Sequence, residues 1–210
     1  MRYATIFGFG LFDQSNPKYK AYVDRFALFV KKNKIDEVVI CGGHTNAAVP
    51  EKSEAGTIAE YLRPILGNVK MHVEDRSLTS EQNIAFAKQF IDINSAEKIF
   101  VIVDSVRFFK VFWMILDRWF GLGKRQIEEE WLNRLIGVYT NPKKKDTTLA
   151  FKDIKKLLFY KNVKLVVDRH HKEYRSAMHT IISEPFEIEA LYDQAVYDKF
   201  LEMTKKKFKM

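Results

Sequence analysis

Short apolar runs alternate with longer amphipathic segments along the first part of the chain, and this alternation constrains the fold more than any other feature. Four runs have the length and composition of strands: residues 3–9, 37–41, 69–73 and 99–103. The segments that follow them repeat apolar residues at helical spacing: 17–34, 54–66, 81–93 and 105–120. Strands joined through helices lie parallel, because a parallel pair needs a crossover connection. The sequence therefore predicts a doubly wound α/β fold, with a mostly parallel sheet and helices on both faces.

The pattern loosens beyond residue 120. Residues 163–167 predict a fifth strand, and residues 187–207 predict a closing helix. Residues 121–160 contain two helical stretches, and about 40 residues rarely bury enough surface to fold alone. We interpret them as a helical insertion in a single domain that spans residues 1–210 and ends in a basic tail at 205–210.

The composition is that of a globular protein, with 47% hydrophobic and 30% charged residues. No run reaches the roughly 18 apolar residues of a membrane-spanning helix, and no signal-peptide pattern is visible, so we expect a cytoplasmic protein without a transmembrane segment. Cys41 is the single cysteine, which excludes an internal disulfide. Because it ends a buried strand, we expect a small core residue and not a nucleophile.

The loops after the strands are the candidate ligand site, because open parallel sheets bind ligands at the carboxyl ends of their strands. Gly8 and Gly10 follow the first strand, but no third glycine completes a dinucleotide fingerprint. Gly42 and Gly43 follow the second strand, and we expect them to cradle an anion together with the helix start at Ser53. Ser53 could equally be an ordinary N-cap.

The most polar of these loops follows the third strand. Glu54, Glu74 and Asp75 are predicted to bind hydroxyl or amine groups, with side chains to orient them supplied by Ser77, Thr79 and Asn83. In the alternative interpretation, Ser80 caps the next helix and Glu81 complements its dipole. Ser105 and Arg107 follow the fourth strand, where an Arg could clamp a phosphate or carboxylate.

These motifs resemble the domain-of-unknown-function family that includes the SanA, YdcF and ElyC proteins. The resemblance covers residues 3 to about 116 and rests on the Gly8–Gly10 turn, Gly42-Gly43, Ser53-Glu54-Ala55, the polar run 74–83 and Asp104-Ser105. It implies a Rossmann-like sheet with an acidic, hydroxyl-rich pocket. Its members are linked to envelope phenotypes, and the resemblance implies S-adenosylmethionine or another nucleotide as a candidate ligand, without a settled reaction.

The chain departs from the family pattern after the fourth strand. Family members carry a His there and an Arg three residues on, whereas this chain has Arg107 and Lys110. A side chain that titrates near neutral pH is thus replaced by a fixed cation. We therefore expect ligand binding at these positions and assign no catalytic residue.

Two further groups of residues are candidates for other roles. Five residues after the fifth strand are of metal-binding types but lack a metal-site spacing, so no metal is predicted: Asp168, His170, His171, Glu173 and His179. The aromatic residues of segment 108–120 recur at helical spacing, as in a core helix, with a partner-binding face as the alternative.

Positive charge is concentrated in the second part of the chain. Residues 121–210 hold 19 basic and 13 acidic side chains, which is +6 of the formal net charge of +8. Such runs are usually solvated, and no nucleic-acid-binding motif is present, so nucleic acid is an unlikely partner. We predict a protein that binds a small polar or anionic, nucleotide-like metabolite, with a transferase or a hydrolase as the candidate kinds of enzyme. The alternative is a non-enzymatic protein whose basic C-terminal part engages nucleic acid or an anionic membrane.

Overall fold

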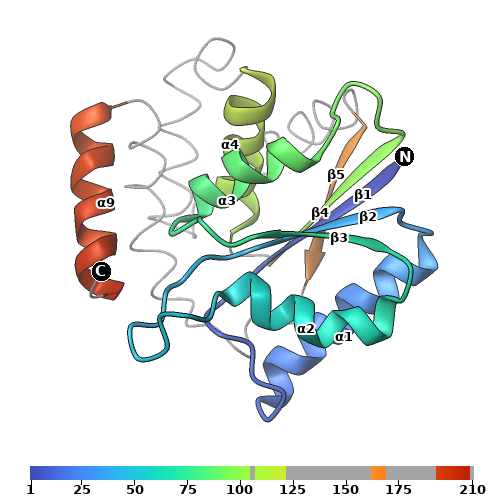
Figure 1. Ribbon diagram of the computed structural model, residues 1–210. Coiled ribbons are helices and arrows are strands. Elements are labelled where there is room, and N and C mark those ends of the chain that lie inside the picture. The colour runs from blue at the N-terminus through green and yellow to red at the C-terminus, as the bar shows by residue number, and fades with distance from the viewer. Residues whose placement is uncertain (105–106, 122–161, 169–192, 209–210) are drawn as a thin grey trace, which may run out of the picture.

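The computed structural model describes residues 1–104, 107–121, 162–168 and 193–208. These residues form a five-stranded parallel sheet with the strand order β3-β2-β1-β4-β5 (Figure 1). The strands are β1 (Arg2–Phe7), β2 (Glu37–Cys41), β3 (Lys70–Glu74), β4 (Lys98–Asp104) and β5 (Val163–Asp168). The predicted α/β, Rossmann-like class is confirmed, as is the predicted fifth strand.

Helices cover both faces of the sheet. The helices are α1 (Pro17–Lys32), α2 (Glu54–Leu66), α3 (Ser80–Ala87), α4 (Phe108–Phe120) and α9 (Gln194–Phe208). Helices α1 and α2 pack with alternate residues of β1 and β2, such as Ile6 and Ile40, while α3 and α4 pack on the intervening residues, such as Phe7 and Val39. Successive side chains of a strand point to opposite faces, so both faces of these strands must be apolar.

The strand order changes direction beside β1. The chain moves outward from β1 to β2 and β3, then returns to place β4 on the other side of β1. In such sheets the ligand crevice lies outside the carboxyl ends of the strands, where the order reverses. The fold therefore places the expected site next to the ends of β1 and β4.

Several predicted boundaries shift. Helix α3 ends at Ala87 and is followed by a 3₁₀ turn, Lys88–Phe90, whereas the apolar spacing predicted a helix over 81–93. Helix α4 begins at Phe108 instead of residue 105. The predicted insertion at 121–160 lies almost entirely outside the described residues. The side chains of Phe112, Leu116 and Trp119 are buried, so α4 is a core helix as its aromatic spacing predicted.

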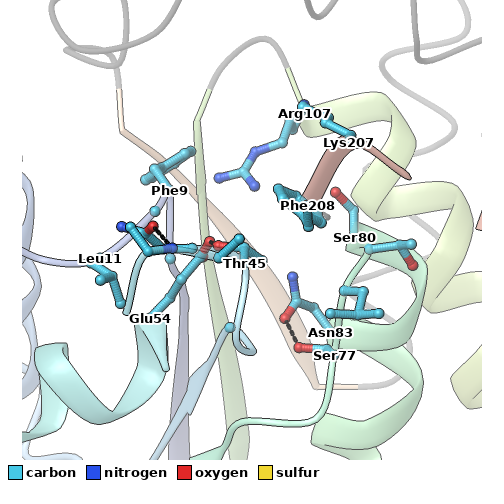
Figure 2. Close-up of a pocket in the computed structure, with 18 residues that line it drawn as sticks. Phe9, Leu11, Thr45, Glu54, Ser77, Ser80, Asn83, Arg107, Lys207 and Phe208 are labelled. Carbon is cyan, nitrogen blue, oxygen red and sulfur yellow. Dashed lines mark hydrogen bonds between the residues drawn. The ribbon is translucent and has the colours of Figure 1, made fainter. Parts of the chain in front are cut away.

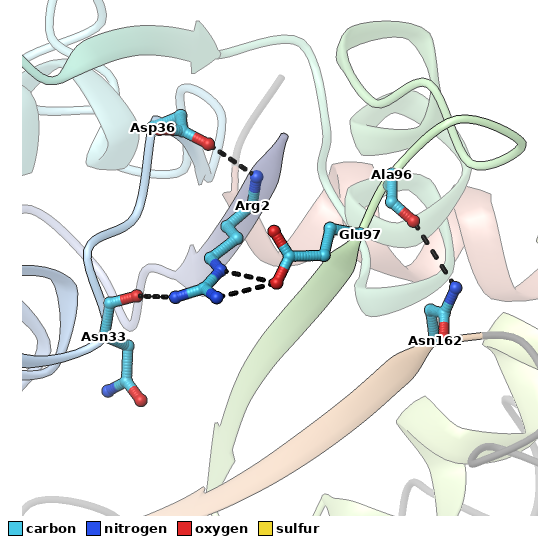
Figure 3. A network of polar contacts seen from close by, with 6 residues as sticks. All are labelled: Arg2, Asn33, Asp36, Ala96, Glu97 and Asn162. Carbon is cyan, nitrogen blue, oxygen red and sulfur yellow. Dashed lines mark hydrogen bonds and ion pairs between the residues drawn. The ribbon is translucent and has the colours of Figure 1, made fainter.

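The amino edge of the sheet is fixed by a polar network (Figure 3). The backbone N–H of Arg2 donates to Asp36 Oδ2 at 2.7 Å, and its guanidinium donates to Glu97 Oε1 at 2.6 Å and to the Asn33 carbonyl at 3.2 Å. Beside it, Asn162 Nδ2 donates to the Ala96 carbonyl at 3.5 Å. The segments that lead into β1, β2, β4 and β5 are thus tied to one another at the edge opposite the expected site.

Candidate functional site

A cavity of about 670 Å³ opens at the carboxyl edge of the sheet (Figure 2). Its described lining comes from the loops after β1, β2 and β3, from the start of α2 and α3, from the residue that precedes α4, and from the end of α9. Seven of the predicted site residues line it: Gly8, Gly10, Gly42, Glu54, Ser77, Thr79 and Asn83. Arg107 is an eighth. The cavity lies at the change of strand direction, as the fold requires.

Glu54 forms the acidic side of the cavity. Its carboxylate accepts a hydrogen bond from Thr45 Oγ1, and its side chain is 8% exposed. A Cβ atom at Gly8 would lie 2.5 Å from Glu54 Oε2, and one at Gly42 would lie 2.8 Å from Glu54 Cβ. Both positions are therefore restricted to glycine, because any side chain would occupy the space of Glu54. Burial and the Glu54 charge also raise the pKa of the Tyr19 hydroxyl, which stays protonated.

The backbone amides expected to cradle an anion already have protein acceptors. Gly42 N donates to the Glu74 carbonyl at 2.9 Å, and Gly43 N donates to the Ser77 carbonyl at 2.8 Å. The first amides of α2 donate to the carbonyls of Gly43 and Gly42, at 3.0 and 2.8 Å. An anion at this helix start would have to displace these bonds, so the structure lends the expected cradle no support.

Ser53 and Gly43 shape the site without lining the cavity. Ser53 is the N-cap of α2, and its Oγ accepts from Gly56 N at 2.9 Å, as the alternative interpretation had it. A Cβ atom at Gly43 would lie 2.3 Å from the Ser77 carbonyl oxygen. Gly43 thus lets the loop after β3 approach the end of β2.

Glu74 and Asp75, predicted as ligand-binding acids, are not among the described lining residues. Glu74 is 1% exposed and pairs in register with Cys41. Its Oε1 accepts from Arg76 N at 2.9 Å, and its Oε2 has no hydrogen-bond partner. Burial raises the pKa of this carboxyl. The Glu74 side chain is thus packed in the protein interior, where it holds the loop after β3 through the hydrogen bond from Arg76 N, and it does not line the cavity.

The start of α3 supplies hydroxyl and amide groups. Ser77 Oγ donates to Asn83 Oδ1 at 2.5 Å, and in Figure 2 the nitrogen end of Asn83 is directed toward the cavity. The N-cap is Thr79, whose Oγ1 accepts from Gln82 N at 3.1 Å, and not Ser80 as the alternative interpretation expected. Thr79 and Ser80 both line the cavity. The Thr-x-x-Gln spacing of residues 79–82, which is that of a capping box, could have predicted Thr79 as the N-cap.

The basic side of the cavity is formed by Arg107 and Lys207. Arg107 is 3% exposed, and its guanidinium carbon lies 4.1 Å from the centroid of the Phe9 ring, a cation–π contact. Lys110, predicted as a second cation here, is also buried but is not among the described lining residues. Among the described lining residues, Glu54 is the one acidic side chain, and Arg107 and Lys207 are the two basic ones.

The sequence reasoning missed the apolar part of the lining. It includes Phe9, Leu11, Leu78 and Phe208, together with two small exposed residues, Ala47 and Ala48. Phe9 stands between Gly8 and Gly10, and that position was a usable signal for it. No sequence signal places Lys207 and Phe208 at this edge, because the apolar spacing of a helix does not tell where the helix packs.

Other candidate groups lie elsewhere. Ser105, His170, His171, Glu173 and His179 lie outside the described residues. Asp168 is described, and its Oδ2 accepts from Arg25 Nη2 at 2.8 Å. Within the described part, no group of three or more His, Cys, Asp or Glu residues could hold a metal ion. Cys41 is buried, and burial together with Glu74 raises its pKa, so the thiol form is favoured over a nucleophilic thiolate. None of the helices that the structure describes is long and apolar enough to cross a bilayer.

Fold and cavity together define a doubly wound α/β protein. Its pocket lies at the carboxyl edge of the sheet and is lined by polar groups and by two phenylalanine rings, those of Phe9 and Phe208. Comparisons with models of known protein families, with curated proteins and with solved structures gave no match for this chain. The resemblance carried by the loop motifs therefore stays a prediction, and the function is argued from the pocket itself.

Proposed function

We propose that the chain binds a small metabolite that carries a ring and an anionic group, such as a nucleotide or S-adenosylmethionine, in the pocket at the carboxyl edge. The observation that carries the proposal is the placement of Glu54 on one side of the cavity, with Arg107 and Lys207 across it in the view of Figure 2. Charged groups of both signs at one concave site favour a ligand with an anionic group and a separate donor group.

The size and lining of the pocket support a ligand of this class. Sites for small molecules commonly enclose about 300 to 1,000 Å³, and this cavity encloses about 670 Å³. Phe9 and Phe208 offer ring faces, while Ser80 and Asn83 offer groups that can bond to hydroxyls or ring nitrogens. A ligand without a ring would leave the apolar lining in contact with water.

The chemistry of the two sides gives each a role in binding. Arg107 presents several donors in a fixed planar arrangement, which suits the oxygens of a phosphate or carboxylate. Glu54 accepts from Thr45, and its second oxygen lies close to the backbone of Gly8 and Gly42. A ligand hydroxyl or amine that donates to this carboxylate would be held at the opposite side.

Thermal unfolding with and without candidate ligands tests the proposal. The panel is AMP, ATP, S-adenosylmethionine and glucose 6-phosphate. A compound at about 100 times its Kd stabilises the folded chain by about 2.7 kcal/mol. For a chain of this size, that stabilisation raises Tm by roughly 5 to 10 °C. If none of the four compounds raises the Tm of the chain, the proposal is contradicted.

A variant that fills the cavity locates the binding. Ala48 is exposed and lines the cavity, so Ala48→Trp places an indole in the ligand space without disturbing the core. Ala195 is equally exposed, lies at the start of α9 and is not among the lining residues, which makes Ala195→Trp the matched control. We expect the ligand-dependent rise in Tm to vanish in Ala48→Trp and to persist in Ala195→Trp. Equal rises in Tm in both variants would show that the ligand binds outside this cavity.

The alternative, in which the basic C-terminal part engages nucleic acid or an anionic membrane, stays a prediction. Binding that falls steeply with added salt is its signature, because contacts to phosphates release counterions. Lys207 is part of the pocket lining, and this placement favours a small anion as the partner of the basic helix end.

A further inference from the structure

The end of helix α9 lines one side of the pocket, although it is distant in sequence from the other described lining residues. Lys207 and Phe208, in the last turn of α9, lie in the same lining as Gly8 and Ser80 (Figure 2). A contact between Gln82 Nε2 of α3 and the Tyr197 hydroxyl of α9, at 3.4 Å, places the helix beside α3. Residues 205–210, expected to be a solvated tail, therefore include part of the site.

Helix α9 contributes little to the core. None of its residues is buried, and Met203 is 55% exposed. The helix rests on half-buried side chains such as Val196, Phe200 and Leu201. Substitutions at its exposed end should therefore leave the fold intact, and their effects can be assigned to the pocket.

The lysines at the C-terminal end of α9 make this end of the helix suitable for binding an anion. The carbonyl groups at a helix C-terminus carry partial negative charge, which by itself would repel a phosphate. Lys205, Lys206 and Lys207 in the last turn oppose that charge. Lys205 pairs with Glu202 at 3.6 Å, while Lys207 Nζ lies 5.5 Å from the centroid of the Phe208 ring. Lys207 is the member of the three that lines the cavity.

We infer that the last turn of α9, together with Arg107, distinguishes a charged from an uncharged ligand. In this inference, which rests on the proposed function, Lys207 contacts the anionic group and Phe208 packs on the adjoining part of the ligand. Arg107 is buried against Phe9 and supplies a fixed charge at one side, whereas the exposed Lys207 completes the anion contact only when the helix end lies against the pocket.

Calorimetric titration of four chains with AMP and with adenosine tests the inference. The chains are wild type, Lys207→Gln, Phe208→Ala and Lys206→Gln, which is the matched control because Lys206 is in the same turn, is exposed and is not among the lining residues. Loss of a hydrogen bond to a charged group weakens binding by about tenfold. We expect that change for AMP with Lys207→Gln, no change for adenosine, weaker binding of both ligands with Phe208→Ala, and wild-type affinities with Lys206→Gln.

The remaining outcomes separate this inference from the proposed function. Equal weakening by Lys206→Gln and Lys207→Gln overturns the inference, because the helix end then acts only through its distant charge. AMP binding that none of the three variants alters overturns it too, while the proposed function holds. A wild-type chain that does not bind AMP contradicts the inference as well, and the other three compounds of the thermal panel then decide whether the proposed function also fails.

Discussion

A Cβ atom at Gly8 would lie 2.5 Å from Glu54 Oε2 and 2.7 Å from Glu54 Cβ. The side chain of Glu54, at the start of α2, therefore packs directly against the backbone of Gly8, at the end of β1. This contact sets the position of the acidic side of the pocket, and it makes glycine a requirement of packing at position 8.

Gly8→Ala should destabilise the chain. The added methyl group cannot be accommodated by the tip of the Glu54 side chain alone, because the Glu54 Cβ is also too close. Overpacking of this kind costs about 1 to 3 kcal/mol, which urea denaturation measures. The loss should be partly recovered in the double variant Gly8→Ala, Glu54→Gly, since contacting residues are not additive. Full additivity of the two changes would show that this contact is not the cause.

Glu74→Gln should stabilise the chain near neutral pH. Burial raises the pKa of Glu74, so the folded state binds its proton more tightly than the unfolded state does. As the pH rises from the unfolded pKa through the folded pKa, stability is lost, because a buried carboxylate must then ionise. The neutral amide avoids this, with an expected gain of roughly 1 kcal/mol at pH 7.

The pH dependence provides the control for this variant. Below about pH 4, near the unfolded pKa of a Glu, both chains are uncharged at position 74 and their stabilities should converge. Glu51→Gln, at an exposed loop residue, should follow wild type over the whole range. A Glu74→Gln chain that is less stable than wild type at pH 7 contradicts the assignment.

Thr79→Ala and Ser80→Ala should differ in their effect on stability, although both residues line the cavity. Thr79 caps α3 by accepting from Gln82 N, and losing a cap costs about 1 kcal/mol. Ser80 faces the cavity, so its loss should leave the stability unchanged and weaken ligand binding. Denaturation and calorimetry on the same two proteins distinguish the roles. Destabilisation by Ser80→Ala with no effect of Thr79→Ala would restore the assignment of Ser80 as the cap.

Arg107→Lys should keep the charge but weaken the binding of AMP by about tenfold, because an ammonium group cannot present two parallel donors to a phosphate. Arg63→Lys is the control, since Arg63 is an exposed residue of α2. Isothermal titration of both variants gives the comparison. An unchanged affinity in Arg107→Lys would remove Arg107 from the anion contact.

The fold could be predicted from the sequence because it depends on apolar periodicity. Residues 38–41 and 99–103 are apolar throughout, as central parallel strands must be, and the structure confirms strands at both places. The loops of the site could be located too, since the carboxyl ends of parallel strands share one edge. Eight of the thirteen predicted site residues accordingly line the cavity: Gly8, Gly10, Gly42, Glu54, Ser77, Thr79, Asn83 and Arg107.

The roles within the site could not be predicted as well. Whether Glu74 points inward or into the pocket depends on the twist and register of β3, which composition does not encode. The amides of Gly42 and Gly43 were expected to cradle an anion, but the end of β3 and the loop after it give them acceptors. Lys207 and Phe208 reach the pocket only through long-range packing, for which one sequence holds no local signal.

An amide NMR titration of the chain with AMP tests the central claim most directly. The account predicts that the resonances that move cluster at the carboxyl edge of the sheet, at Gly10, Ser80 and Phe208, while those of Arg2 and Glu97 at the amino edge stay fixed. Shifts confined to the amino edge, or no shifts when AMP is in large excess, would contradict it.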